Sequence, residues 1–454
     1  MEKQKYYHRH IDQALIAWKN SPRHKPLLLR GARQVGKSSS VAHLAQEFDN
    51  CVEINFERKP IYHKIFQGDL DAKHIVETIV TLTGEKIIPG KTLLFFDEIQ
   101  MCKEAILSLR FFWEDLPDLH VIAAGSLLEF ALNEIPTFGV GRIHSMFMYP
   151  MSFDEFLGAL GMDDIYNTKR KATQDSPLQT VIHEQLVSLF RTYLLVGGMP
   201  ECVDTWVTTH SYDSCQDVQK EIIYTYEVDF AKYKKQANVN LLRLTLHSTA
   251  HQIGSKFIYS QVSRDYRSTQ IKESLNLLTL AGLISPVYCT SANGFPLGAE
   301  ADEKCVKYLF LDSGLLLALL GVDYGSISQI SEEILVGNAA DLVNKGHITE
   351  MVAGLEMMKY MSADHTPSLY FWMRDAKNSM AEVDYIIAKN MEILPIEIKA
   401  EVRGGMKSLY SFVESKSIHH AVRSSLENFG KFQKDKCEID IFPLYALSNL
   451  IQNK

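Results

Sequence analysis

The sequence has no paired cysteines, no long apolar run and no excess of positive charge. Its seven cysteines are scattered without a CxxC pair, so we expect no disulfides and no structural zinc. The longest apolar runs, such as 315–322, are too short to span a bilayer, and the first residues contain no apolar signal-peptide stretch. We therefore expect a cytoplasmic protein that makes no contact with a membrane.

The size and charge of the chain limit the remaining possibilities. Its 454 residues, 46% of them hydrophobic, are enough for about three domains with a core each. The formal net charge of −8 and the pI near 6.1 argue against a generally cationic surface for nucleic acid. A local basic face is still compatible with these values, so DNA is not excluded as a partner.

Eight residues near the start, GARQVGKS at 31–38, match the phosphate-binding pattern GxxxxGK[ST]. In such a loop the glycines let backbone N–H groups converge on a phosphate, the lysine reaches the β- and γ-phosphates, and the serine hydroxyl ligates Mg²⁺. An apolar run at 26–30 precedes the loop and helical spacing at 37–48 follows it, which points a helix N-terminus at the anion. We predict that ATP and Mg²⁺ bind here, through Gly31, Gln34, Val35, Gly36, Lys37, Ser38 and Ser39.

A second informative stretch lies at 91–100, where an apolar strand ends in Asp97 and Glu98. Ligands of open α/β sheets bind at the carboxyl ends of the strands. We expect Asp97 to hold Mg²⁺ together with Ser38, and Glu98 to act as the general base that polarises the attacking water. The alternative is that the two carboxylates cap the following helix.

Three further candidates have less specific patterns. Ser126 ends an apolar strand and either contacts the γ-phosphate or the attacking water, or caps a helix at 127–132. Arg142 lies in a glycine-containing loop; it stabilises charge at a γ-phosphate, in its own site or in a neighbour's, or is exposed to solvent. Tyr6 or Tyr7 stacks on adenine, or packs against the protein.

These motifs, together with YPMSFDEF at 149–156 and VGGMPE at 196–201, resemble the prokaryotic AAA-type ATPases that carry a C-terminal restriction-endonuclease-like domain of unassigned role. The resemblance covers nearly the whole chain. It implies an α/β fold: a P-loop NTPase parallel sheet with helices on both faces, then a helical and winged-helix region, then an α/β domain of the restriction-endonuclease type. It also implies that the phosphate loop, Asp97 and Glu98 form the nucleotide site.

From this we predict four parts: an ATPase domain at 1–158, a helical lid or linker at 178–236, a winged helix-turn-helix-like part at 237–300 and a restriction-endonuclease-like domain at 301–454. The polar residues at 160–178 predict a surface loop or lid boundary, and 322–333 predict a linker. We interpret the glycine pair of VGGMPE as the end of a helix at 186–195, which the following proline prevents from continuing.

The winged-helix prediction depends on the stretch from 268 to 300. It begins with helix-capping residues, has a glycine at its helix end and continues into a strand and a glycine-containing turn. Across the whole part from 239 to 300 the exposed cations are few, and acidic residues offset them. A DNA partner and a protein partner therefore fit this part equally well.

The last cluster of chemical interest combines Asp384 with Glu397 and Lys399, in the D…ExK arrangement of restriction-type nucleases. Strand alternation puts Glu397 and Lys399 on one face. With Glu350 from a preceding helix, the carboxylates would bind Mg²⁺, and Lys399 would stabilise charge at a phosphate. The alternative is a solvated face, or carboxylates that pair with Lys399.

Three functions follow from these patterns. The first is a Mg²⁺-dependent ATPase whose nucleotide state controls a C-terminal half that binds DNA or a protein partner. The second is an ATP-regulated, metal-dependent DNA nuclease, and the third is a non-hydrolysing nucleotide switch that recruits a protein. Glu98 favours hydrolysis, because a switch has less need of a base. Oligomerisation is compatible with all three.

Overall fold

The computed structural model describes residues 5–126, 128–133, 141–233, 238–321, 345–376, 379–400 and 405–452. The chain forms two compact units. The amino-terminal unit comprises residues 1–149 with two short segments at 280–282 and 362–366, and the carboxy-terminal unit comprises the remainder. No helix within the described ranges has the length and apolar composition needed to cross a bilayer.

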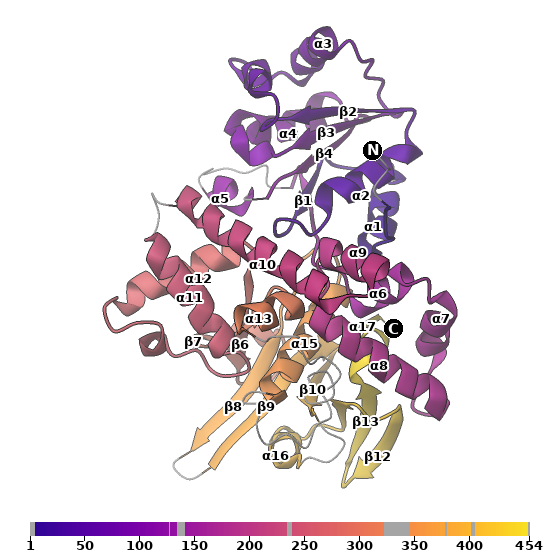
Figure 1. The fold of residues 1–454 in the computed structure, drawn as a ribbon, viewed down its shortest axis with the longest axis vertical. Helices are drawn as coiled ribbons and strands as arrows, with labels where there is room; N and C mark the ends of the chain where they lie inside the picture. The colour runs from indigo at the N-terminus through magenta and orange to yellow at the C-terminus, as the bar shows by residue number, and fades with distance from the viewer. Residues whose placement is uncertain are drawn as a thin grey trace. The chain divides into compact units, whose positions relative to one another are not determined.

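The amino-terminal unit is built on a parallel sheet. Its strands are β1 (Leu27–Arg30), β2 (Asn50–Asn55), β3 (Thr92–Asp97), β4 (His120–Ala124) and β5 (His144–Phe147). Its helices are α1 (His10–Lys19), α2 (Lys37–Leu44), α3 (Ala72–Thr83), α4 (Lys103–Asp115) and α5 (Leu128–Asn133). All five strands are parallel, in the order β2-β3-β4-β1-β5 (Figure 1). The predicted α/β fold with a parallel sheet is confirmed.

Apolar burial explains this sheet and positions its loops. Every residue of β3 and β4 is buried, so both faces of these central strands need cover. α3 and α4 contribute Ile75, Ile79 and Leu109 to the core on one face, while α2 packs against β4 and lies beside α1 (Figure 1). Because β4 separates β1 from β3, the segments that follow these three strands meet at one edge of the sheet.

The carboxy-terminal unit contains most of the helices and a second sheet. Its helices are α6 (Phe153–Ala159), α7 (Asp163–Lys171), α8 (Thr180–Val196), α9 (Pro200–Thr209), α10 (Tyr212–Asp229), α11 (Val239–His251), α12 (Ser268–Leu280), α13 (Ser313–Leu319), α15 (Lys345–Tyr360), α16 (Lys407–Lys416) and α17 (Leu447–Gln452). Its strands are β6 (Ile284–Thr290), β7 (Ala301–Phe310), β8 (Tyr370–Ala376), β9 (Ser379–Lys389), β10 (Glu392–Ile398), β11 (His420–Ser425), β12 (Gly430–Lys434) and β13 (Cys437–Pro443).

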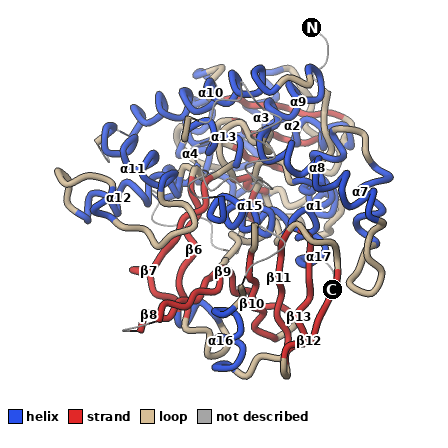
Figure 2. Tube along the Cα trace, turned by 60° about the horizontal axis from the view of Figure 1, so that its bottom comes forward, coloured by secondary structure: helices blue, strands red, loops and turns tan. Residues whose placement is uncertain are grey.

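These eight strands form one mixed sheet in the order β12-β13-β11-β10-β9-β8-β6-β7 (Figure 2). β9 pairs antiparallel with β8 and with β10, whereas β10 and β11 are parallel and connected through α16. β6 and β7 form an antiparallel hairpin that joins this sheet through β8. The four-part division of the chain stays a prediction, and the predicted linker at 322–333 lies outside the described residues.

The prediction of a surface loop at 160–178 is wrong in part, because residues 163–171 form the helix α7. Two aspartates in its first turn and three basic residues in its last turn favour a helix through its dipole. One of the basic residues, Lys169, is fully buried, and its Nζ lies 2.5 Å from Oδ1 of the buried Asp154. A polar sequence therefore concealed a buried ion pair, which composition alone cannot distinguish from a solvated segment.

The VGGMPE segment ends a helix as predicted, since α8 ends at Val196, and the structure adds that a second helix, α9, begins at Pro200. The structure adds a reason for both glycines. A Cβ on Gly197 would lie 2.1 Å from Oδ1 of Asp312, and one on Gly198 would lie 2.0 Å from the carbonyl oxygen of Met151. The Gly198 amide donates to Asp312 Oδ2 at 2.6 Å. Within the carboxy-terminal unit, the backbone of this segment packs so closely against Asp312 and Met151 that no side chain fits at either glycine.

Candidate functional site

The phosphate loop connects β1 to α2 and depends on two glycines. Gly31 has φ 143°, and a Cβ there would lie 2.2 Å from the Met148 carbonyl oxygen. Gly36 has φ 99° at the amino end of α2, a conformation that side chains rarely adopt. Val35 is fully buried and anchors the loop, whereas the predicted ligands Gln34, Ser38 and Ser39 are exposed. The first amides of α2 and the serine hydroxyl are thus available to an anion.

Arg9 supports this loop from the segment before α1, and sequence reasoning missed it. Its guanidinium donates to the carbonyl oxygen of Val35 at 2.9 Å and to that of Tyr149 at 2.7 Å. Arg9 is only 8% exposed, so these hydrogen bonds are strong restraints on the loop backbone. An arginine that donates to backbone carbonyls belongs to no motif, so no sequence pattern indicates it.

Lys37 lies inside the loop. Its Nζ donates to the carbonyl oxygens of Gly31 at 2.9 Å and Ala32 at 2.7 Å. Burial lowers the pKa of Lys37 to about 8, although the carboxylates of Glu98 and Asp97 act in the opposite direction. The ammonium is therefore charged near neutral pH and is stabilised by Asp97, the last residue of β3, and by Glu98, which follows it.

We expect the affinity for ATP to fall at alkaline pH because of this lowered pKa. Above about pH 8 the free protein has lost the Lys37 proton and must regain it when phosphates bind, so the Kd for ATP should rise about 30-fold from pH 7 to 9.5. Calorimetry in two buffers of different ionisation enthalpy measures the proton uptake. AMP, which lacks the β- and γ-phosphates, should bind equally over this range. A flat profile for ATP would contradict the assignment of Lys37.

Asp97 ends β3 directly beside the loop. The Ser38 Oγ donates to Asp97 Oδ1 at 3.2 Å, and Asn55 Nδ2 donates to Asp97 Oδ2 at 2.9 Å. Burial, followed by the charge of Glu98, raises the pKa of Asp97. The hydroxyl and the carboxylate are hard oxygen donors of the kind that Mg²⁺ takes, so these residues fit the expected ion. Asn55 ends β2 in register with Asp97, a position that strand pairing could have indicated.

Glu98 follows in a left-handed conformation with φ 51°, and its carboxylate is oriented by two donors. Gln100 Nε2 and the Ser126 Oγ both donate to Glu98 Oε2, the latter at 3.3 Å. Gly125 makes room for this arrangement, since a Cβ there would lie 1.9 Å from Oε1 of Gln100. Ser126 therefore contacts the expected base, and Gln100 is a positioning residue that the prediction did not include.

Arg142 lies away from this site. It precedes β5, and the register of β5 with β1 puts His144 beside Leu27, whereas the phosphate loop leaves the other end of β1. Its Nε donates to Glu114 Oε1 at 2.6 Å, and its side chain is about half exposed. Arg142 thus does not face its own phosphate loop, and a role in a neighbour's site stays a prediction.

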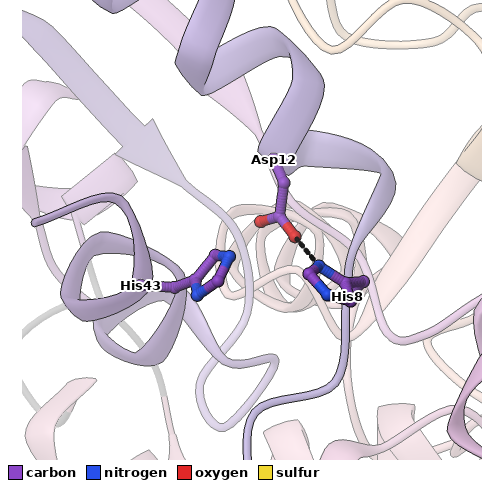
Figure 3. Close-up of side chains that lie close together, drawn as sticks. All are labelled: His8, Asp12 and His43. Atoms are coloured by element: carbon purple, nitrogen blue, oxygen red, sulfur yellow. Dashed lines mark ion pairs between the residues drawn. The ribbon is translucent and has the colours of Figure 1, made fainter. Parts of the chain in front are cut away.

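The predicted adenine contact, Tyr6, packs beside the cluster of His8, Asp12 and His43 that Figure 3 shows at the carboxyl end of α2. The ring of Tyr6 stacks on His43 with centroids 4.2 Å apart, and its hydroxyl donates to Asp12 Oδ1 at 2.6 Å. Nδ1 of His8 lies 3.7 Å from Asp12 Oδ2, which also accepts the Arg9 amide at 2.8 Å. These contacts hold the segment before α1 against the carboxyl end of α2.

In the carboxy-terminal unit the predicted acidic residues separate into two groups. Oxygens of Glu350, Asp384 and the unpredicted Glu382 lie within 4.8 Å of one another. Asp384 Oδ2 also accepts the amide of Ile398 at 2.7 Å. Glu397 is not in that set, and its Oε1 instead accepts Lys399 Nζ at 2.6 Å. Carboxylate pairing with Lys399, an alternative left open by the sequence, is thus present.

Burial dominates the electrostatics of both groups. It raises the pKa of Glu350 to about 8 and that of Glu397 to about 7, and it also raises the pKa of Asp384. Lys307 of β7 counters this for Glu350, because its Nζ lies 2.8 Å from Glu350 Oε1 and also donates to Glu382. The donors would suit a divalent cation, but an ammonium already lies against two of them.

Comparison with known proteins agrees with the amino-terminal site. Residues 23–157, which include the phosphate loop, Asp97, Glu98 and Ser126, match the family described as an AAA domain. This part of the chain is therefore similar to the AAA-type P-loop domains of that family. Residues 187–326 and 345–447 match two domains of unknown function, DUF8612 and DUF4143, so the restriction-endonuclease type of the C-terminal part stays a prediction.

Two similar solved structures have identities of 15% or less. The Walker-type ATPase PABY2304 of Pyrococcus abyssi is 15% identical with a TM-score of 0.45, covering 69% of this chain and 96% of that one. The Aeropyrum pernix Orc1 protein in complex with DNA is 11% identical with a TM-score of 0.30, covering 70% and 94%. No curated protein matches the sequence.

Proposed function

We propose that this chain is a Mg²⁺-dependent ATPase. The observation that carries the proposal is the carboxylate of Glu98, which Gln100 and Ser126 orient at the end of β3, next to Asp97 and the phosphate loop. A fixed general base beside the loop is what hydrolysis requires. A nucleotide switch that only binds ATP has less need of it.

In this proposal each residue has a distinct task. The loop amides and Lys37 bind the β- and γ-phosphates, and Ser38 and Asp97 would hold Mg²⁺, which would offset the charge of the phosphates when bound. Glu98 takes a proton from the water that attacks the γ-phosphate, and Ser126 helps to keep Glu98 in the orientation for this transfer.

We further propose that the nucleotide state controls partner binding by the carboxy-terminal unit. The order of α11, α12 and the β6–β7 hairpin is that of a winged helix, which supports a binding module. Its charge is modest, and Lys272 on α12 is within 3.8 Å of Glu303. The partner is DNA or a protein, and a DNA effect on turnover distinguishes the two.

Phosphate release by the purified chain tests this proposal. We expect turnover of ATP in Mg²⁺ that falls to background when EDTA removes the metal, because Ser38 and Asp97 need the ion to engage the phosphates. Parallel reactions with duplex DNA report whether DNA changes the rate. Tight ATP binding without phosphate release in Mg²⁺ would instead identify a switch and contradict hydrolysis.

A further inference from the structure

The acidic cluster of the carboxy-terminal unit contains a buried cation of its own. Lys307 extends from β7, its side chain is 3% exposed, and its Nζ contacts oxygens of both Glu350 and Glu382. The ammonium also lies over the ring of Phe371, 5.0 Å from its centroid. A buried lysine in such a place is stable only because the carboxylates around it compensate its charge.

The carboxylates around Lys307 form a metal-type ligand set. Glu350, Glu382 and Asp384 come from α15 and β9 and offer oxygens within 4.8 Å of one another, which suits a hard divalent cation such as Mg²⁺ or Mn²⁺. An ion bound to these oxygens would share two of its three ligands with the ammonium and be repelled by it. A metal ion and the Lys307 ammonium would therefore compete for the same carboxylate oxygens.

We propose that the ammonium of Lys307 is the resident cation of this cluster and excludes divalent metal from it. The cluster then fixes β7 to α15 and β9 instead of supporting metal chemistry. The exclusion of metal by Lys307 requires no nucleotide, so the inference does not depend on the proposed ATPase function. It also predicts that the three carboxylates bind a divalent metal once Lys307 is replaced by an uncharged residue.

Mn²⁺ binding to the full chain without nucleotide tests this inference, by electron paramagnetic resonance of free Mn²⁺. The variant Lys307→Met removes the charge and keeps most of the volume. We expect it to bind Mn²⁺ at least tenfold more tightly than the unmodified chain, and the double variant Lys307→Met/Asp384→Asn to lose this gain. Lys304→Met, on an exposed position of the same strand, is the matched control and should leave binding unchanged.

Two results would overturn the proposal. One is a folded Lys307→Met variant, judged by circular dichroism and thermal melting, that gains no Mn²⁺ binding. The other is Mn²⁺ binding by the unmodified chain that Asp384→Asn abolishes, since the cluster would then take metal beside the lysine. If Lys307→Met does not fold, this second comparison still decides the question: equal binding with and without Asp384→Asn supports exclusion.

Discussion

Replacing Glu98 by Gln is expected to reduce the kcat of ATP hydrolysis by about 10²- to 10⁴-fold, the usual contribution of a general base. Glutamine keeps the size of the side chain and an oxygen that can accept from Gln100 and Ser126. Its amide cannot take a proton from water, so binding should survive while chemistry is lost. Phosphate release measures the loss of kcat. Calorimetry measures binding and should give a Kd for ATP within about threefold of the unmodified value.

The control for this substitution is Glu77→Gln on the exposed side of α3, which makes the same chemical change away from the loop. It should turn over ATP at the normal rate. Near-normal turnover by Glu98→Gln would show that another group acts as the base, and the role given to the end of β3 would have to be abandoned.

Replacing Lys37 by Ala is expected to weaken ATP binding by about 100-fold or more. The ammonium should make two charge-assisted hydrogen bonds to the phosphates, each contributing about 1.5 to 3 kcal/mol. Phosphate release at fixed ATP should fall with the binding. Because burial already lowers the pKa of Lys37, its removal should shift the melting temperature of the free protein little.

Lys73→Ala on the exposed face of α3 removes a positive charge from the same unit and should bind ATP normally. Lys37→Ala and Glu98→Gln together separate binding from chemistry. Lys37→Ala should lose both ATP binding and hydrolysis, whereas Glu98→Gln should lose only hydrolysis. Full ATPase activity in a folded Lys37→Ala variant would remove the phosphate loop from the mechanism.

Much of the amino-terminal unit could be predicted because its signals are local. The glycines of the loop, the apolar run of β3 and the two acidic residues after it each act within a few positions of one another. The strands and helices predicted around them are present within a few residues of the expected bounds. Contacts across the chain left weaker signals: only strand pairing could have indicated Asn55 beside Asp97, and no pattern indicates that Arg9 donates to Val35.

The acidic residues of the carboxy-terminal unit also show that sequence spacing does not determine which side chains meet in space. The D…ExK spacing predicted one set of Glu350, Asp384 and Glu397, whereas the oxygens that come together belong to Glu350, Glu382 and Asp384. Spacing along a strand does not reveal which neighbour is closest in space. Nor does it reveal that an ammonium from another strand is present.

The sequence by itself determined the phosphate loop, the acidic end of β3 and the α/β class, because these depend on backbone conformation and burial over a few consecutive residues. The tertiary structure decided which side chains that are distant in the sequence contact one another. β6 and β8 lie between β7 and β9 in the sheet, yet Lys307 of β7 contacts Glu382 of β9. Such a contact depends on how the sheet and α15 pack, and local sequence does not encode it.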